Sequence, residues 1–132
     1  MRVTVNPDAQ ASSAFSYAAP GEYTLRIKSC ELKQKEGSEF GYLAWVLEFA
    51  DPNVRGVEKD NAGNALKVGG IFENTSLKPD AQFRLRDLCE AIGRTWGDFD
   101  TTEAIAQELR AKVGIETYNG KIKNTIDRFV KR

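Results

Sequence analysis

The sequence contains no histidine, and its 132 residues include only two cysteines, four prolines and one methionine. Without histidine, imidazole acid–base catalysis, a Ser–His or Cys–His nucleophile pair and a histidine-ligated metal site are excluded. Cys30 and Cys89 stand far apart and form no Cys-x-x-Cys pair, so a zinc site would lack ligands. We expect two free, buried thiols in a reducing cytoplasm, and neither a metal nor a cofactor.

The sequence also lacks an excess of either charge, because 19 Lys and Arg balance 19 Asp and Glu. This balance excludes a nucleic-acid binder that is cationic throughout, so any such binding must use local patches. No apolar run is as long as a membrane span, and residues 1–20 lack the apolar segment that a signal peptide needs. We therefore expect a cytoplasmic protein with no membrane partner.

What remains is an ordinary globular composition, with 41% hydrophobic and 29% charged residues in a length typical of one domain. Residues 1–20 are rich in Ala, Ser, Asn and Pro, which indicates a flexible arm or a strand added at a sheet edge. Pro20 and Gly21 then mark the entry into regular structure. Residues 21–132 form the predicted domain.

Two half-buried strands are predicted near the start of this domain. Apolar and polar residues alternate over 22–28 and again over 42–49, and a polar loop at 33–41 separates the two runs. The second strand ends before Pro52, since proline cannot donate to a ladder. Trp45 belongs to the apolar face of that strand, which indicates the core.

A third strand is predicted over 66–75. Gly69 and Gly70 interrupt it, and such a pair indicates a bulge or a sharp bend of the kind that a small curved barrel requires. The preceding stretch, 53–65, is polar and predicts a long loop, with a small hairpin at 61–64.

Two helices are predicted in the next part of the chain. The first begins near Pro79, and Gly93 caps its end. Its apolar stripe at i, i+3, i+4 and i+7 consists of Leu85, Leu88, Cys89 and Ile92. The second begins at Asp100, with Glu103 completing a capping pattern, and continues to about Arg110.

The last part of the chain predicts a β-hairpin. Apolar and polar residues alternate over 113–117 and 122–126, on either side of the two-residue turn Asn119-Gly120. The predicted fold is mainly β, with three strands, one or two helices and two more strands. This order fits the five-stranded antiparallel Greek-key barrel called the OB-fold, whose helix lies between strands 3 and 4. An open sheet with a packed helix is the alternative.

No catalytic constellation stands out in the sequence. The 19 carboxylates show no pairing typical of a glycosidase or a metal cage. The sequence contains no glycine-rich phosphate-binding loop of the type that ends in Lys-Ser or Lys-Thr. We therefore expect a protein that is not an enzyme.

Charge is distributed unevenly along the chain. Residues 95–110 contain four acidic groups and one arginine, a net charge of −3, whereas residues 111–132 contain six basic and two acidic groups, a net charge of +4. Aromatic residues are interleaved with the basic ones. This combination is typical of single-stranded nucleic-acid binding, because rings stack on bases and cations contact phosphates.

Two groups of outward-facing residues fit that pattern. The predicted phosphate contacts are Arg26, Lys28, Lys33, Lys121, Lys123 and Arg128. The predicted stacking rings are Tyr42, Tyr118 and Phe129, with Phe72 as a fourth whose face depends on the glycine bend. The alternative is that the basic set is an ordinary solvated face and that the rings cover the barrel ends.

Three stretches within residues 21–130 carry a further signal. The first is Gly21-Glu22-Tyr23 followed by Gly41-Tyr42-Leu43, and the second runs from Ile71-Phe72-Glu73-Asn74-Thr75 into the helix that ends at Ala91-Ile92-Gly93. The third is Val113-Gly114-Ile115-Glu116, then Tyr118-Asn119-Gly120 and Asn124-Thr125-Ile126. In this order they resemble a group of small bacteriophage proteins considered single-stranded-DNA-binding proteins or their relatives.

The resemblance implies an OB-fold and a role in replication or recombination in the cytoplasm of an infected bacterium. It implies no individual functional residues, so the candidate residues above come from the face assignment alone. Many single-stranded-DNA-binding proteins end in an acidic tail that recruits partners. This chain ends in the basic stretch Phe129-Val130-Lys131-Arg132, so we do not expect recruitment through such a tail.

Two functional hypotheses follow. The first is non-enzymatic, sequence-tolerant binding of single-stranded DNA, with the loops at 33–41 and 53–67 closing over the strand. The second is an adaptor or inhibitor that grips a replication or recombination protein, which the zero net charge and the acidic stretch at 98–108 favour. The arm at 1–20 could also pair with a neighbour's sheet edge and form a homodimer or higher oligomer.

Overall fold

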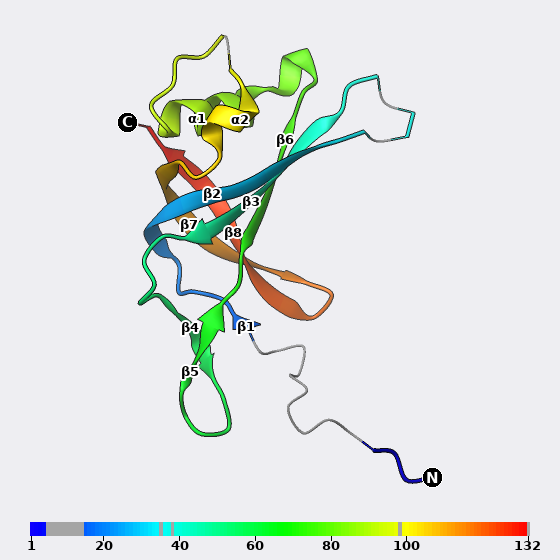
Figure 1. The fold of residues 1–132 in the computed structure, drawn as a ribbon, viewed down its shortest axis with the longest axis vertical. Coiled ribbons are helices and arrows are strands. Elements are labelled where there is room, and N and C mark those ends of the chain that lie inside the picture. The colour runs from blue at the N-terminus through cyan, green and yellow to red at the C-terminus, as the bar shows by residue number, and fades with distance from the viewer. Residues whose placement is uncertain (5–14, 35, 38, 98, 132) are drawn as a thin grey trace.

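The computed structural model describes residues 1–4, 15–34, 36–37, 39–97 and 99–131, so half of the predicted arm (residues 5–14) and Asp98 lie outside the described residues. The elements are, in chain order, β1 (Phe15–Ser16), β2 (Gly21–Lys33), β3 (Tyr42–Phe49), β4 (Arg55–Lys59), β5 (Ala65–Val68), β6 (Ile71–Ser76), a 3-10 turn (Pro79–Ala81), α1 (Phe83–Ala91), α2 (Thr101–Ala104), β7 (Glu108–Tyr118) and β8 (Lys121–Val130) (Figure 1). The predicted mainly β class is confirmed. Within the described ranges, none of the helices is long and apolar enough to cross a membrane.

Five strands form one sheet in the order β6-β3-β2-β7-β8, and every neighbouring pair in it is antiparallel. The predicted helix, α1, follows the third of these strands and precedes the fourth. The edge strands β6 and β8 approach each other beside α1, but no ladder joins them within the described part of the chain (Figure 1). The predicted closure of the barrel is therefore not made by backbone hydrogen bonds.

Arg84 of α1 connects the two edges of this sheet. Its Nε donates to Glu73 Oε1 on β6 at 2.7 Å, and its Nη2 donates to the backbone carbonyl of Ile126 on β8 at 3.0 Å. The guanidinium carbon also lies 5.0 Å from the centroid of the Phe129 ring. One side chain thus links the edges where a closed barrel would have a ladder.

Three short strands form a second sheet in the order β1-β5-β4. The prediction of one strand over 66–75 is wrong, because β5 belongs to this small sheet and β6 to the large one. Gly70 allows the chain to pass close to β3 at this change of sheet, since a Cβ on it would lie only 3.3 Å from the Leu47 carbonyl oxygen. The predicted hairpin at 61–64 is confirmed, since Asp60 Oδ1 accepts hydrogen bonds from Ala62 and Asn64 at its turn.

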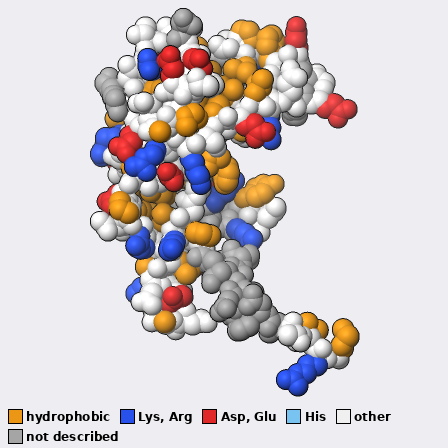
Figure 2. Space-filling view, viewed as in Figure 1, with side chains coloured by type: hydrophobic (Ala, Val, Ile, Leu, Met, Phe, Trp, Pro, Cys, Tyr) orange, Lys and Arg blue, Asp and Glu red, His pale blue; other side chains and the backbone are white. Residues whose placement is uncertain are grey.

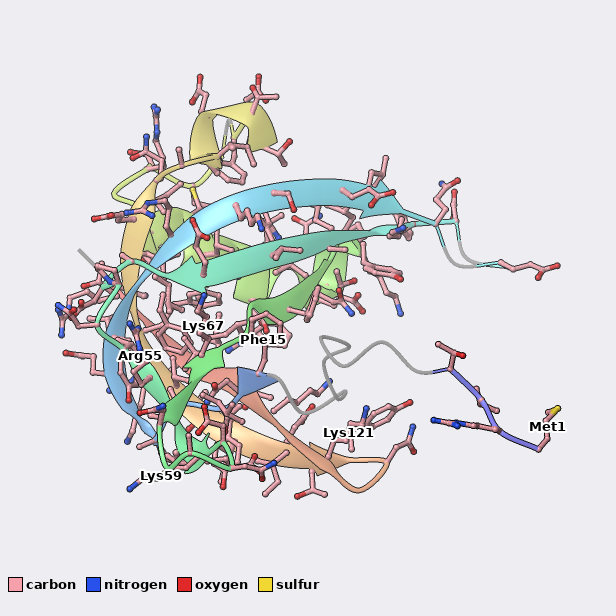
Figure 3. The ribbon with its side chains drawn as sticks, turned by 60° about the horizontal axis from the view of Figure 1, so that its bottom comes forward. Met1, Phe15, Arg55, Lys59, Lys67 and Lys121 are labelled. Atoms are coloured by element: carbon pink, nitrogen blue, oxygen red, sulfur yellow. The ribbon has the colours of Figure 1, made fainter. Side chains whose placement is uncertain are left out.

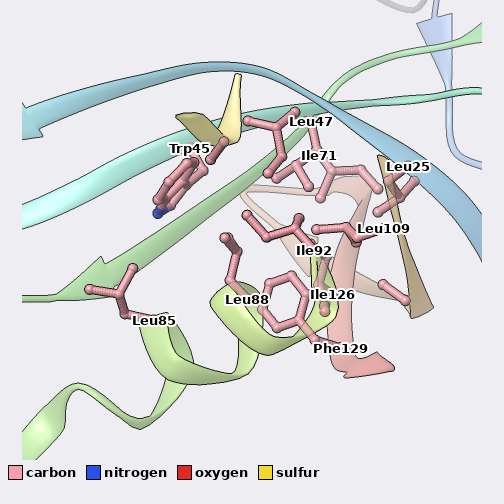
Figure 4. Packing of buried hydrophobic residues seen from close by; sticks show 14 of the residues in the cluster. Leu25, Trp45, Leu47, Ile71, Leu85, Leu88, Ile92, Leu109, Ile126 and Phe129 are labelled. Atoms are coloured by element: carbon pink, nitrogen blue, oxygen red, sulfur yellow. The ribbon is translucent and has the colours of Figure 1, made fainter. Parts of the chain in front are cut away.

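The hydrophobic core lies between the large sheet and α1 (Figure 4). Leu85, Leu88 and Ile92 of the predicted stripe face residues from all five strands. Trp45 is fully buried there, and its Nε1 donates to Thr75 Oγ1 at 2.9 Å. The two cysteines are free: Cys89 is buried, and partial burial raises the pKa of the Cys30 thiol to about 11.

The second predicted helix is much shorter than expected. Asp100 caps α2 as predicted, its side chain accepting from the Thr102 N–H at 3.0 Å, but the helix ends at Ala104. From Glu108 the chain pairs with β2 instead, with Leu109 opposite Leu25. Leu109 fits either a helical or an alternating pattern, and strand pairing decides between them.

The predicted C-terminal hairpin is confirmed. β7 and β8 pair from Tyr118 opposite Lys121 onward. Asn119 and Gly120 have φ values of 50° and 76°, and two successive positive φ values are what a type I′ turn requires.

Candidate nucleic-acid interface

Two adjoining hollows lie between the large sheet and the small one. The large hollow, of about 790 Å³, lies over the outward faces of β3 and β6, and the small hollow, of about 400 Å³, lies between β1 and the tip of the β7–β8 hairpin. The two share Phe15, Gly69 and Gly70 in their linings. We call the pair the trough.

Three aromatic rings project into the trough. Phe72 lines the large hollow and is 70% exposed, and Tyr118 lines the small hollow and is 64% exposed. Phe15, 61% exposed, lines both. Large aromatic side chains are normally buried, so three exposed rings in one groove indicate a surface that contacts a ligand.

Basic side chains accompany these rings along the trough. Lys28, Arg55 and Lys67 line the large hollow, and Lys121 and Lys123 line the small one. Figure 3 shows Phe15, Arg55 and Lys67 around β1, β4 and β5, with Lys121 on the neighbouring hairpin. Lys and Arg side chains also gather across the middle of the face in Figure 2, with hydrophobic side chains between them.

The local backbone explains why several of these cations face the trough. The β2–β3 register shifts between Ile27 and Ser29, so Lys28 is the extra residue of a bulge and stays exposed. Arg55 is held by its own loop, its Nη1 donating to the carbonyls of Pro52 and Val54. Lys67 lies opposite Phe15 in the β1–β5 ladder.

Few negative charges oppose these cations. The carboxylates in the trough lining belong to Glu48 and Asp51. Glu48 is paired with Arg26 at 3.4 Å. Lys123 is paired with Glu116 at 3.3 Å and lies 5.2 Å from the centroid of the Tyr118 ring. Lys28, Lys67 and Lys121 form no ion pair with the described residues, so the trough keeps an excess of positive charge.

Phe15 is held in place by the residues that follow it. The buried Asn124 side chain accepts from the Ala18 N–H at 2.8 Å and donates to the Ala18 carbonyl at 3.0 Å. Ser16 Oγ donates to Glu58 on β4 at 3.2 Å. Residues 15–18 of the predicted arm are thus fixed against both sheets.

Sequence-predicted candidates fall into two groups. The structure brings five of them together in the trough: Lys28, Phe72, Tyr118, Lys121 and Lys123. The others lie outside it: Arg26, Lys33, Tyr42, Arg128 and Phe129. The predicted 53–67 segment does border the trough, through Val54, Arg55 and Lys67.

Arg26 and Lys33 have carboxylate partners of their own. Arg26 pairs with Glu48 at 3.4 Å and with Glu108 at 2.9 Å, and these hydrogen bonds raise the pKa of its guanidinium. Lys33 pairs with Glu31 at 3.1 Å. Their charges are therefore largely balanced within the protein.

The prediction that Phe129 faces outward is wrong. It is 4% exposed and belongs to the core, because β8 does not stay regular. The β7–β8 register shifts between Lys112 and Val113, which leaves Asp127 as an extra residue and turns Phe129 inward. Arg128 remains exposed opposite Lys112, and Tyr42 is half-buried between Lys33 and Ser76.

The sequence prediction missed Phe15, Arg55 and Lys67. Phe15 belongs to the predicted arm, and Arg55 belongs to a stretch predicted as a loop. No sheet face was therefore predicted for either side chain. The alternation of Leu66, Lys67 and Val68 predicts that Lys67 points away from its neighbours, but not which surface it reaches.

A scan against models of protein families finds no match, and neither does a search of curated proteins. Among the described residues, no group of three or more His, Cys, Asp or Glu side chains could hold a metal ion. The trough presents three exposed rings and five basic side chains.

Proposed function

We propose that the chain binds single-stranded DNA along the trough, with little preference for base sequence. The observation that carries this proposal is the interleaving of three exposed rings with five basic side chains in two connected hollows. Flat rings stack on any base, and lysine and arginine contact phosphates whatever the sequence.

The strand arrangement supports the same proposal. We infer an OB-fold-like barrel that is partly open between β6 and β8, since the strand order and the place of α1 match that fold. Such barrels bind oligonucleotides on the face of their second and third strands and through the loops after strands 1 and 4. The corresponding strands here are β3 and β6, which carry the large hollow, and the turn after β7 borders the small hollow.

The geometry favours a single strand over a duplex. Stacking on Phe15, Phe72 or Tyr118 needs unpaired bases, because a duplex hides its base faces in its own stack. The cations lie around the rings rather than on a helix that could enter a groove. Together with the resemblance to phage proteins, this supports a role in protecting single strands during replication or recombination.

A titration of a fluorescent thymidine oligonucleotide of about 30 bases, at several salt concentrations, tests this proposal. If all five basic side chains contact phosphates, we expect the logarithm of the association constant to fall against the logarithm of salt with a slope of about −3.5, at ~0.7 per contact. A duplex of equal length serves as control. Absence of binding to the single strand at low salt would refute the proposal.

The alternative function, docking of a protein partner, is favoured by a different surface. Phe83 at the start of α1 is 66% exposed and shares a hollow of about 290 Å³ with Trp96 and Arg86. A pull-down that depends on Phe83 and is indifferent to DNA would support this alternative.

A further inference from the structure

We infer that the ligand is one continuous strand that crosses from the large hollow to the small one over Gly69 and Gly70, so that Gly69 determines how long a strand the site accommodates. This inference rests on the proposed function. The shared lining carries it, because both glycines and Phe15 belong to both hollows.

The two glycines differ in what a side chain would meet. A Cβ on Gly70 would lie 3.3 Å from the Leu47 carbonyl oxygen and 3.6 Å from Val46 Cγ1, so packing against β3 explains its lack of a side chain. A Cβ on Gly69 would contact only Phe15 Cβ, at 3.8 Å, which is ordinary van der Waals contact.

The backbone at Gly69 does not require glycine either. Its φ lies outside the left-handed region, unlike those of Gly63 and Gly120. Neither packing nor conformation therefore accounts for glycine at position 69. What its bare backbone does provide is an open crossing beside Phe15, and glycine within a strand region commonly marks a close approach by a ligand.

The rings on either side define the ligand further. Phe72 lies in the large hollow, Tyr118 in the small hollow, and Phe15 at the crossing between them. A mononucleotide can use one ring only, whereas an oligonucleotide that crosses over Gly69 reaches all three. The site therefore selects a continuous strand by adding up contacts along the trough.

A length series with Gly69→Val tests this inference. The affinities of thymidine oligonucleotides of about 3 and about 12 bases are measured for the wild type, for Gly69→Val and for Ala65→Val. Ala65 is an exposed residue at the start of β5 that does not line the trough, so it is a matched control. We expect Gly69→Val to weaken binding of the long strand by about 10- to 100-fold, the loss of one or two stacked bases, and to leave the short strand unchanged.

Each outcome has one meaning. If the wild type binds neither strand, the proposed function is wrong. If the wild type binds the long strand more tightly and Gly69→Val keeps the same length dependence, the crossing is refuted and the function stands.

Circular dichroism melting verifies the fold of Gly69→Val. Gly69→Ala, with a methyl group that the structure accommodates, supplies a second variant, for which we expect a smaller loss in the same direction.

Discussion

Replacing Phe15 and Phe72 together by alanine is expected to lower the affinity for single-stranded DNA by at least about 30-fold, because each stacked base is worth ~1–3 kcal/mol. Both rings are more than half exposed, so their removal deletes little packing. The thermal stability of the variant should therefore stay close to that of the wild type. The measurement is the oligonucleotide titration at low salt, with a thermal melt in parallel.

Phe83→Ala provides the matched control for this variant. Phe83 is 66% exposed, between the exposures of the two test residues, but lies with Trp96 outside the trough. We expect it to bind DNA like the wild type. Equal losses in Phe83→Ala and in the double variant would mean that the rings of the trough have no special part in binding.

Arg84→Ala is expected to destabilise the fold by about 2–4 kcal/mol, close to the cost of removing one partner of a buried ion pair. Glu73, whose side chain is 13% exposed, would keep its charge without its cation. The variant also loses the hydrogen bond to the Ile126 carbonyl and the contact with Phe129, so the sheet edges β6 and β8 lose their link. Urea unfolding monitored by tryptophan fluorescence measures the change.

The pH dependence of this effect follows from Glu73. Burial raises the pKa of its carboxyl group, and the charge of Arg84 and its hydrogen bond oppose the rise. A carboxyl whose pKa is higher in the folded state favours folding while protonated and costs stability as pH rises through that folded pKa. Without Arg84 the cost grows, so the stability difference between Arg84→Ala and the wild type should widen from mildly acid to neutral pH.

Glu73→Gln in the Arg84→Ala background separates charge from packing. Removing the unpaired carboxylate should restore part of the lost stability at neutral pH, since an uncompensated buried charge is the main cost. A stability difference that does not depend on pH, and no rescue by Glu73→Gln, would show that Arg84 acts through packing alone.

Local signals in the sequence were sufficient for much of the fold. The turn at Asn119 and Gly120 was predictable because a two-residue turn with two positive φ values strongly favours this pair. The stripe of α1 and the apolar face around Trp45 were predictable because helical and alternating periods place their residues on one side. Of the candidate site, alternation placed Lys28 on an outward face and the hairpin turn placed Tyr118 beside Lys121, whereas the face of Phe72 depended on the glycine bend.

The rest depended on pairing between distant segments. The bulge at Asp127, which turns Phe129 into the core, is set by the register of β7 and β8. The alternation of the neighbouring residues in the sequence does not predict it. Phe15 reaches the trough because Asn124, far away in the sequence, binds Ala18. Residues from Glu108 onward form a strand because β2 offers them a partner, which outweighs their helical spacing.

Ultraviolet crosslinking of a thymidine oligonucleotide to the protein, followed by peptide mapping, tests the location of the binding surface most directly. We predict crosslinks in peptides that contain Phe15, Phe72 and Tyr118, which no single strand lying elsewhere would produce. Competition by unlabelled single strand, but not by duplex, should remove them. Crosslinks confined to Phe83 and Trp96, on the other hollow, would contradict DNA binding in the trough.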